Sequence, residues 1–308
     1  MVDIVISEFM HKNAVADLSR DFEVHYEPTL GSDLPSLARA VRHARALIIR
    51  DRTVVDIPLI AQALDLRVIG QVGAVSDNID MLSCEARGVS IVRAPDMMAD
   101  AIGEYVIASA MMLVRGAFFA SREVMAGKWP RGHLVGREIN GRTLGLLGLD
   151  FGARAAAQRA QALGMKVIGW DPFLKSAHPV WRDVERVEFD ALLAESDVVS
   201  VHLPARPELI GRVGTVALAR LKPTAVLISV GGGGVVDEAT VANMLSIGRL
   251  RGAAFDGFET EPLNSEAGSI FAAVPNLLLT PRIADLTLES HLRSSAAIVA
   301  KVRGALNL

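Results

Sequence analysis

The residues best suited to chemistry lie in a glycine-containing turn and in an acid that follows it. The turn at 148–153 (GLDFGA) comes after the apolar run at 143–147, and Asp171 ends the next apolar run, 23 residues beyond Gly148. Backbone N–H groups at the start of a helix bind a pyrophosphate, and an acid at the end of the following strand binds ribose hydroxyls. The spacing therefore predicts a dinucleotide site. Asp171 favours NAD over NADP because its carboxylate repels a 2′-phosphate.

Asp150 makes this turn unusual. The dinucleotide fingerprint has glycine at this position, where the backbone closely approaches the pyrophosphate. A carboxylate about 5 Å from a phosphate charge costs about 3 kcal/mol at an effective dielectric constant of about 20. Aspartate is also a preferred N-cap, so Asp150 is alternatively the cap of a helix that begins at Phe151, with Gly152 leaving room for a ligand. The sequence leaves both interpretations open.

Strand and helix patterns that alternate along the chain must position these residues. In the first third, runs rich in β-branched residues near Ile4, Ile48 and Ile69 predict parallel strands that are buried on both faces. Helical patterns lie between them at 33–45 and 58–64. This alternation predicts parallel βαβ units.

A long helical pattern at 98–126 separates this third from a second alternation that begins near Arg142. Strands are predicted there in the runs TLGLLGL, MKVIGW, DVVSVHLP, AVLISVG and GAAFDGF, and a helix at 153–163. The fold class is therefore predicted to be α/β, with two Rossmann-like domains that contain parallel sheets and a boundary near residue 98.

Composition limits the possible partners. A chain of 308 residues that is 51% hydrophobic and 22% charged has a large core and room for two domains. The net charge is −3 and no run of Lys or Arg is present, so neither nucleic acid nor a membrane is expected as a partner. The apolar stretch at 101–120 contains Glu104 and Arg115 and is predicted to be a buried or subunit-facing helix. One cysteine, Cys84, and no secretory signal predict a cytoplasmic protein.

Several segments of the chain are similar to one known family. They are GQVGAVSDNID at 70–80, Gly103-Glu104-Tyr105 in place of Ala-Glu-His, INGRTLGLLGL followed by GMKVIGWDP, VHLP at 201–204 and FDGFETEPL at 255–263. Over nearly its whole length the chain resembles the D-isomer-specific 2-hydroxyacid dehydrogenases, the family of phosphoglycerate, glycerate and D-lactate dehydrogenases.

The resemblance implies a formate/glycerate dehydrogenase-like architecture. A flavodoxin-like substrate-binding domain would comprise 1–97 plus 286–308, an NAD-binding Rossmann domain would comprise 98–285, and the active site would lie in the cleft between them. A homodimer formed through the nucleotide-binding domain is implied as well. The resemblance also implies substrate contacts at Gly73, Ala74 and Val75, and cofactor contacts at Gly148, Asp150, Phe151, Gly152, Asp171, Pro172, His202, Leu203, Pro204, Val230 and Asp256.

The catalytic residues depart from the family pattern. In the family an arginine grips the substrate carboxylate, a histidine exchanges a proton with the substrate, and a glutamate pairs with that histidine. The arginine position is Gly232 here and the histidine position is Arg282, whereas Glu261 is retained. The flanking segments VVDE at 235–238 and Thr280-Pro281 fix the register of both replacements.

These replacements change the expected chemistry. Loss of the arginine removes charge-assisted hydrogen bonds worth about 1.5–3 kcal/mol each. Arg282 cannot serve as a general acid near neutral pH because a guanidinium keeps its proton there, so it is predicted to pair with Glu261. Alternatively it is a relocated clamp for an anionic substrate, with the space over Gly232 left for a larger group. The proton would then come from Tyr105, His133 or His202.

The sequence thus predicts an NAD-dependent oxidoreductase with an altered active site. It would transfer hydride between the nicotinamide and a small-molecule hydroxy or keto compound that is not a small 2-keto acid. Two alternatives remain open. One is a non-catalytic module that binds NAD(H) or another ligand, and the other is a non-redox reaction in the same cleft. The sequence shows no metal-ligand cluster.

Overall fold

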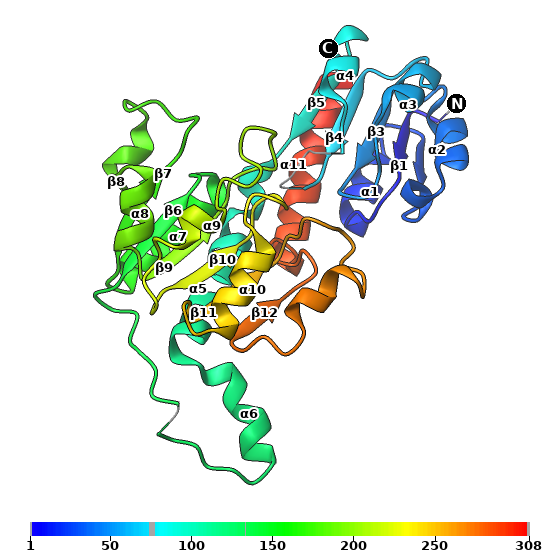
Figure 1. The fold of residues 1–308 in the computed structure, drawn as a ribbon. Helices are drawn as coiled ribbons and strands as arrows, with labels where there is room; N and C mark the ends of the chain where they lie inside the picture. The colour runs from blue at the N-terminus through cyan, green and yellow to red at the C-terminus, as the bar shows by residue number, and fades with distance from the viewer. Residues whose placement is uncertain (1, 74–77, 133, 307–308) are drawn as a thin grey trace. The chain divides into compact units, whose positions relative to one another are not determined.

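A computed structural model gives the fold of the chain (Figure 1). It describes residues 2–73, 78–132 and 134–306. By contacts, the chain divides into two compact units, one of Met1–Met98 with Leu286–Leu308 and the other of Ala99–Asp285. We call them the terminal unit and the central unit. Both are built on a parallel sheet, so the predicted α/β class with two parallel-sheet domains is confirmed.

The sheet of the terminal unit has five strands in the order β2-β1-β3-β4-β5, and all neighbours are parallel. The strands β1, β3 and β4 are buried throughout, as their β-branched runs predict. The strand order reverses between β1 and β3, so the loops that follow these two strands meet at one edge of the sheet. The strands are β1 (Ile4–Ile6), β2 (Val24–Tyr26), β3 (Ala46–Ile49), β4 (Val68–Gln71) and β5 (Ser90–Arg93).

Helices of the terminal unit begin at aspartates in three cases. Asp33, Asp56 and Asp80 each accept a backbone N–H three residues later, which satisfies an N-terminal donor of α2, α3 and α4. The C-terminal helix α11 packs on β4, where a Cβ on Gly70 would lie 2.8 Å from Val302 Cγ2. Glycine at residue 70 is therefore required by this packing. The helices are α1 (Lys12–Leu18), α2 (Leu34–Val41), α3 (Ile57–Gln62), α4 (Met81–Ala86) and α11 (Leu288–Leu306), with 3-10 turns η1 (Leu30–Ser32) and η2 (Pro95–Met98).

The sheet of the central unit has seven parallel strands in the order β12-β11-β10-β9-β6-β7-β8. Its order reverses between β6 and β9, which have adjacent carboxyl ends. In open parallel sheets, ligands bind in the crevice at such a reversal. The strands are β6 (Thr143–Leu147), β7 (Lys166–Trp170), β8 (Glu185–Arg186), β9 (Val198–Val201), β10 (Val226–Ser229), β11 (Gly252–Phe255) and β12 (Leu277–Leu279).

The long helix predicted at 98–126 is two helices in the structure. Gly116 has a φ of +66° and divides α5 from α6. A left-handed residue ends an α-helix, and glycine adopts that conformation without strain. The helices are α5 (Ala99–Arg115), α6 (Ala117–Met125), α7 (Phe151–Ala162), α8 (Phe189–Glu195), α9 (Thr215–Leu218) and α10 (Glu238–Ser246), with 3-10 turns η3 (Pro179–Arg182) and η4 (Ala267–Phe271).

Helix α5 is the most apolar of the chain's long helical segments. With the turn before it, it forms the segment Pro95–Arg115, which is long and apolar enough to cross a membrane by length and composition alone. Its most apolar window is 56% buried inside the structure, a property that core helices share. Within the central unit it packs against α7, where a Cβ on Gly103 would lie 2.9 Å from the carbonyl carbon of Ala155.

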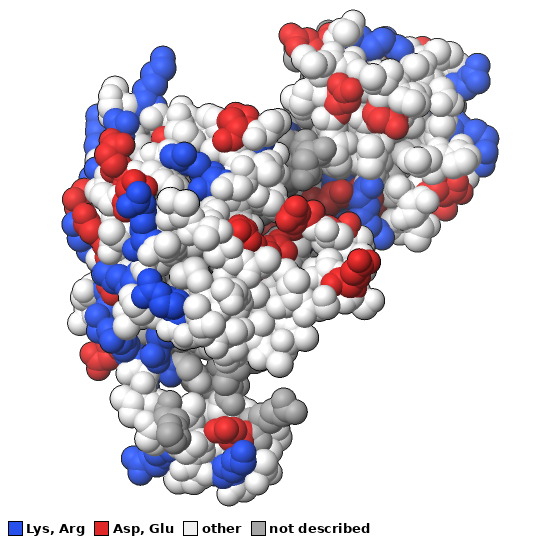
Figure 2. Space-filling model, viewed as in Figure 1, with Lys and Arg blue, Asp and Glu red and all other residues white. Residues whose placement is uncertain are grey.

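Acidic and basic side chains are mixed over the surface of the central unit on the face that Figure 2 shows. Ion pairs of this kind include Lys166 with Glu185 at 3.0 Å and Arg220 with Asp190 at 3.1 Å. A nucleic-acid-binding face gathers cations of one sign into a stripe or patch. The mixed face shown does not have that character.

Candidate active site

The candidate active site of the central unit lies at the carboxyl ends of its strands. The turn after β6 carries Gly148 and Asp150, the residue after β7 is Asp171, and His202 follows β9. The glycine run at 231–234 follows β10, and Asp256 follows β11. The topology thus brings residues from five strand ends to one edge of the sheet.

The turn after β6 has the backbone geometry that a dinucleotide site needs. Gly148 has a φ of +86°, and a Cβ there would lie 3.1 Å from both the His202 carbonyl carbon and the Leu203 nitrogen. Leu149 N donates to Asp171 Oδ2 at 2.8 Å, and Asp171 Oδ1 accepts from Phe173 N at 2.8 Å. The acid at the end of β7 is therefore held against the turn, where a ribose would bind.

Asp150 caps its own helix. Its Oδ1 accepts a hydrogen bond from Ala153 N at 2.7 Å, and α7 begins at Phe151, as the capping interpretation predicts. The same oxygen lies 3.2 Å from His202 Nδ1, and His202 Nε2 lies 2.9 Å from Ser200 Oγ. The His202 side chain is fully buried, whereas 47% of the Asp150 side chain is exposed. One face of the carboxylate is thus bound and the other faces solvent.

The charge of Asp150 is stabilised where it stands. Burial alone would raise the pKa of Asp150, but His202, the Ala153 N–H and nearby Arg154 together hold the pKa below its ordinary value. Arg154 Nε also donates to Leu149 O at 2.8 Å. The carboxylate is therefore ionised at neutral pH and has cationic or N–H partners on its bound side.

Gly152 does not leave room for a ligand, contrary to the expectation from the sequence. A Cβ at residue 152 would lie 2.5 Å from Ile102 Cγ2 and 2.9 Å from Ile102 Cβ. Gly152 is buried and lies where α7 crosses α5. Its small size lets the two helices pack closely.

The glycine run after β10 is packed rather than open, so the expectation of space over Gly232 is wrong. Gly232 N donates to Leu203 O at 2.9 Å, and Gly231 N donates to Val201 O at 3.0 Å. A Cβ at Gly232 would overlap the backbone nitrogen of Ala205 and lie 2.7 Å from Ala205 Cα. The run therefore fits against the segment that follows β9, and Val230 N joins it by donating to Val201 O at 3.1 Å.

Arg282 and Glu261 form the ion pair that the sequence predicts. Arg282 Nε donates to Glu261 Oε2, and Glu261 Oε1 accepts from Phe258 N at 2.7 Å. About a third of each side chain is exposed, 31% for Arg282 and 29% for Glu261. Arg282 adopts a φ of +50°, which is uncommon outside glycine and is frequent at functional sites. A permanent positive charge is therefore held beside Glu261 at this edge of the sheet.

Asp256 shapes the loop that carries Arg282. Its Oδ1 accepts from Thr280 Oγ1 at 2.6 Å and from Ile283 N at 2.8 Å, and its Oδ2 accepts from Ala284 N at 2.9 Å. Arg282 N donates to the Asp256 carbonyl at 2.9 Å. Asp256 is 5% exposed, and the loop uses both of its carboxylate oxygens.

The proton donors considered from the sequence differ in their surroundings. Tyr105 hydroxyl lies 2.5 Å from Thr280 Oγ1. Burial and the nearby Asp256 carboxylate raise the pKa of Tyr105, and hydrogen bonds to Thr280 and Ser109 only partly offset this, so it is a neutral phenol. His202 is enclosed between Ser200 and Asp150. His133, like Ala74 and Val75, lies outside the described residues.

The other residues that the resemblance suggests as contacts also follow the carboxyl ends of strands, each in its own unit. Pro172 and Pro204 are exposed directly after Asp171 and Leu203, and Leu203 is buried beneath the turn. Gly73 is buried shortly after β4 in the terminal unit.

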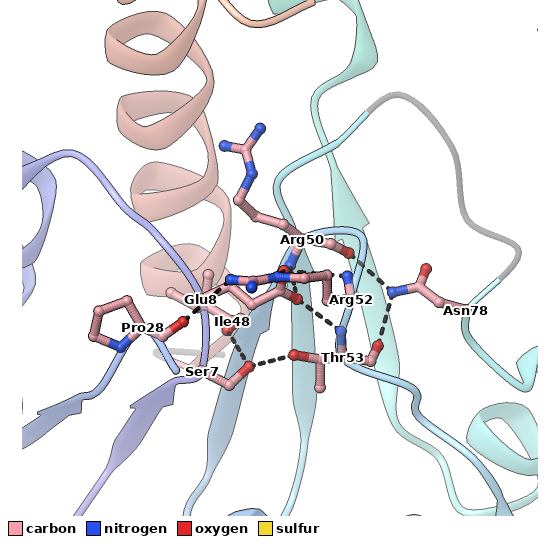
Figure 3. A network of polar contacts seen from close by, with 8 residues as sticks. All are labelled: Ser7, Glu8, Pro28, Ile48, Arg50, Arg52, Thr53 and Asn78. Atoms are coloured by element: carbon pink, nitrogen blue, oxygen red, sulfur yellow. Dashed lines mark hydrogen bonds and ion pairs between the residues drawn. The ribbon is translucent and has the colours of Figure 1, made fainter. Parts of the chain in front are cut away.

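The sequence interpretation missed a polar network at the strand-order reversal of the terminal unit. Glu8 follows β1, is 3% exposed, and accepts the backbone N–H groups of Arg50 and Thr53 at 2.9 Å each and of Arg52 at 3.1 Å. Asn78 Nδ2 donates to the carbonyls of Arg50 and Thr53 at 2.9 and 2.8 Å. Figure 3 shows this network fixing the Arg50 backbone while the Arg50 guanidinium points away from Glu8.

The Arg50 guanidinium belongs to a basic cluster, defined here as Arg50, His291 and His11. Arg50 Nη1 lies 3.3 Å from His291 Nδ1, and Arg50 is 7% exposed. Burial, Arg50 and His11 all lower the pKa of His291, in that order. The two arginines of RDRT, directly after a buried strand, could have indicated a basic site from the sequence. Their contact with His291 could not, because His291 lies 241 residues from Arg50.

Replacing Glu8 with glutamine is expected to lower the stability of the terminal unit by about 2 kcal/mol at neutral pH, since hydrogen bonds to a charged group contribute about 1.5–3 kcal/mol. Burial would raise the pKa of Glu8, but hydrogen bonds from Thr53, Arg50 and Arg52 outweigh it and lower the pKa. A lowered folded pKa means that the stabilisation is present above the ordinary value of 4.5 and is lost as the pH falls through the folded pKa.

Hydrogen exchange of β1 and β3 as a function of pH measures this effect. The difference between wild type and Glu8→Gln should be constant near neutral pH and shrink on acidification. Glu27→Gln, at an exposed carboxylate 3.6 Å from His25, is the matched control and should change little. A Glu8→Gln protein as protected as wild type at neutral pH would contradict the assigned role.

Comparison with known proteins agrees with this geometry. Residues 107–284 match the NAD binding domain of the D-isomer specific 2-hydroxyacid dehydrogenases. The chain is 42% identical to the (S)-sulfolactate dehydrogenase of Chromohalobacter salexigens, over 100% of this chain and 99% of that protein. It is 33% identical to the D-3-phosphoglycerate dehydrogenase of Mycobacterium leprae, over 98% of this chain but 56% of that longer protein.

The fold is shared with solved structures. The D-lactate dehydrogenase of Aquifex aeolicus, solved with NAD and lactic acid, superposes with a TM-score of 0.86 at 22% identity over 99% of this chain and 96% of that one. The turn after β6, the acid at Asp171 and the matched domain agree, and the cofactor is NAD. The chain belongs to the D-isomer specific 2-hydroxyacid dehydrogenase family.

Proposed function

We propose that the chain is an NAD-dependent oxidoreductase with an altered active site. It transfers hydride between the nicotinamide and a hydroxy or keto compound other than lactate, glycerate or phosphoglycerate. The central unit binds the cofactor and the terminal unit contributes to substrate binding. The observation that carries this proposal is the Glu261–Arg282 ion pair, which puts a fixed cation at the position of the family's proton-transferring histidine.

The packing of Gly232 supports a substrate that is held differently from a simple 2-keto acid. No side chain can project from residue 232 without displacing Ala205, so the family's bidentate arginine has no equivalent there. Two charge-assisted hydrogen bonds of about 1.5–3 kcal/mol each are lost with it, which weakens binding of a lone carboxylate by about 100-fold or more.

The basic cluster of the terminal unit is a candidate site for an anionic group. Arg50 and His291 lie 3.3 Å apart, and their mutual repulsion contributes to the lowered pKa of His291. An anion bound beside them would be attracted to the Arg50 guanidinium and would favour protonation of His291. The 42% identical relative is named for a sulfonated hydroxy acid, so a hydroxysulfonate such as sulfolactate is the first compound to test.

The residues of the chain suggest how the reaction proceeds. NAD, when bound, accepts or supplies the hydride. Arg282 remains protonated and stabilises the negative charge that develops on the substrate oxygen, while Glu261 fixes its orientation through Nε. Asp256 holds the loop that presents Arg282. Tyr105, bonded to Thr280, is the described candidate for the proton donor.

A kinetic comparison of purified proteins tests the proposal. Wild type should change nicotinamide absorbance with at least one doubly anionic hydroxy acid other than phosphoglycerate. Arg282→Ala should lower kcat/KM for that compound by about 100-fold, because a charge-stabilising donor contributes about 3 kcal/mol. Arg220→Ala removes a comparable arginine–aspartate pair at the surface of the same unit and should leave kcat/KM within about twofold.

Each other outcome would favour a different function. Turnover of lactate, glycerate or phosphoglycerate at rates matching the best compound contradicts the altered specificity. Binding of NADH without turnover of any tested compound favours a ligand-binding module. Conversion of a compound without any absorbance change, followed by NMR, favours a non-redox reaction.

A further inference from the structure

The carboxylate at the second glycine position of the turn is joined to a buried histidine. Asp150 Oδ1 lies 3.2 Å from His202 Nδ1, and Ser200 Oγ lies 2.9 Å from His202 Nε2. The two residues face each other because β6 and β9 are neighbours at the strand-order reversal. Nε2 is bonded to Ser200, and Nδ1 is a buried ring nitrogen that has no hydrogen bond of good geometry and faces the Asp150 carboxylate.

We propose that Asp150 and His202 form a proton-binding pair, and that NAD(H) binding is coupled to the uptake of one proton by this pair. A pyrophosphate held by the N–H groups at the start of α7 would lie close to the partly exposed Asp150 carboxylate. Its negative charge disfavours a second anion at that position. A proton added to the pair removes one negative charge from the turn, so the protonated pair accepts the pyrophosphate more readily.

The charged groups around the turn are consistent with this coupling. From α7, Arg154 faces Asp150, and its Nε is bonded to Leu149 O. From the end of β7, Asp171 is bonded through Oδ2 to Leu149 N. From the segment after β10, uncharged Gly231 packs against the carbonyl carbon of His202.

The ionised state of Asp150 in the free protein provides the starting point. Its pKa is below the ordinary value despite burial, because His202, Ala153 N–H and Arg154 stabilise the carboxylate. The pyrophosphate works against that stabilisation. By linkage, uptake of one proton makes the affinity for NADH fall by about tenfold for each pH unit above neutrality.

Calorimetric titration of the full chain with NADH tests the coupling without any turnover. Titrations at one pH in two buffers of different ionisation enthalpy give the number of protons taken up. We expect a value between about one half and one for wild type near neutral pH, since linkage limits it to one proton per pair. Asp150→Asn keeps an N-cap but cannot ionise, and should reduce the uptake to zero and bind NADH more tightly at high pH.

A second variant and a matched control separate the pair from general effects. His202→Asn retains a donor near the Nδ1 position without a titrating ring, and should also abolish proton uptake. His43→Asn removes an exposed histidine 2.9 Å from Asp65 in the terminal unit and should leave the uptake unchanged.

The remaining outcomes overturn the inference. Heats that do not depend on the buffer, or uptake that persists in both Asp150→Asn and His202→Asn, would show that the pair is structural. No NADH binding by wild type, with binding restored in Asp150→Gly, would show that the pair closes the site. Loss of turnover with intact proton-linked binding would count against the proposed oxidoreductase and not against this coupling.

Discussion

Replacing Asp256 with alanine is expected to lower the free energy of unfolding of the central unit by about 3–5 kcal/mol, the cost of removing one member of a buried charged network. Its carboxylate accepts hydrogen bonds from Thr280 Oγ1, Ile283 N and Ala284 N, and Asp256 is 5% exposed. Alanine would leave the buried Ala284 N–H and the part-buried Ile283 N–H without their acceptor. The left-handed conformation of Arg282 would lose its support as well.

Urea denaturation followed by tryptophan fluorescence measures this effect in the intact chain. All three tryptophans, Trp129, Trp170 and Trp181, belong to the central unit, so their signal reports on that unit. Asp190→Ala is the matched control. Its carboxylate is 61% exposed and pairs with Arg220, so its removal should cost less than about 1 kcal/mol. An Asp256→Ala protein as stable as this control would show that the loop is held by other contacts.

The sequence predicted the central strands well and the edge strands poorly. Strand β3 is buried along its whole length, and its sequence is a continuous apolar run. Strands β2, β5, β8 and β12 lie at the edges of their sheets and were not predicted. These strands are two to four residues long and have no fully buried residue, so they give too short a pattern to identify a strand.

Interpretation of the glycines failed where their neighbours come from distant parts of the chain. The requirement for a positive φ at Gly148 is local and follows from the turn. The partners of Gly152 and Gly232 are Ile102 and Ala205, which no local pattern places beside them. The sequence could therefore identify where the turns lie, but not which atoms fill the space beside each glycine.

The contacts between paired residues could likewise be predicted only where the positions of both partners were known from the sequence. The Glu261–Arg282 pair was predicted because the resemblance supplies both positions. The Asp150–His202 pair was not, since it depends on β6 and β9 being neighbours at the strand-order reversal. The contact between Arg50 and His291 depends on the C-terminal helix returning to the N-terminal sheet. Topology, rather than residue type, determines both contacts.

Gly232→Arg is expected to destabilise the central unit by about 3 kcal/mol or more, at the upper end for overpacking, and to leave activity on lactate unrestored. The Cβ of any residue at 232 would overlap the Ala205 nitrogen, and that nitrogen belongs to the backbone. Adding Ala205→Gly removes a methyl group but leaves the overlapping nitrogen, so it should not rescue the variant. Gly132→Arg is the control, because a Cβ at residue 132 would meet no heavy atom of the described residues within 4 Å. It should change stability by less than about 0.5 kcal/mol.

The double variant Gly232→Arg/Arg282→His tests whether these two side chains alone determine the substrate specificity. It supplies both residue types that the resemblance leads us to expect at these positions, so a chain whose specificity is set by these two side chains alone would oxidise lactate. We expect no such gain, because the segment after β9 occupies the direction in which the arginine would project. Lactate oxidation by a stably folded double variant, measured as NADH formation, would show that this segment can move aside. Continued inactivity with a native tryptophan spectrum would place the specificity in the backbone of 203–205 as much as in residue 232.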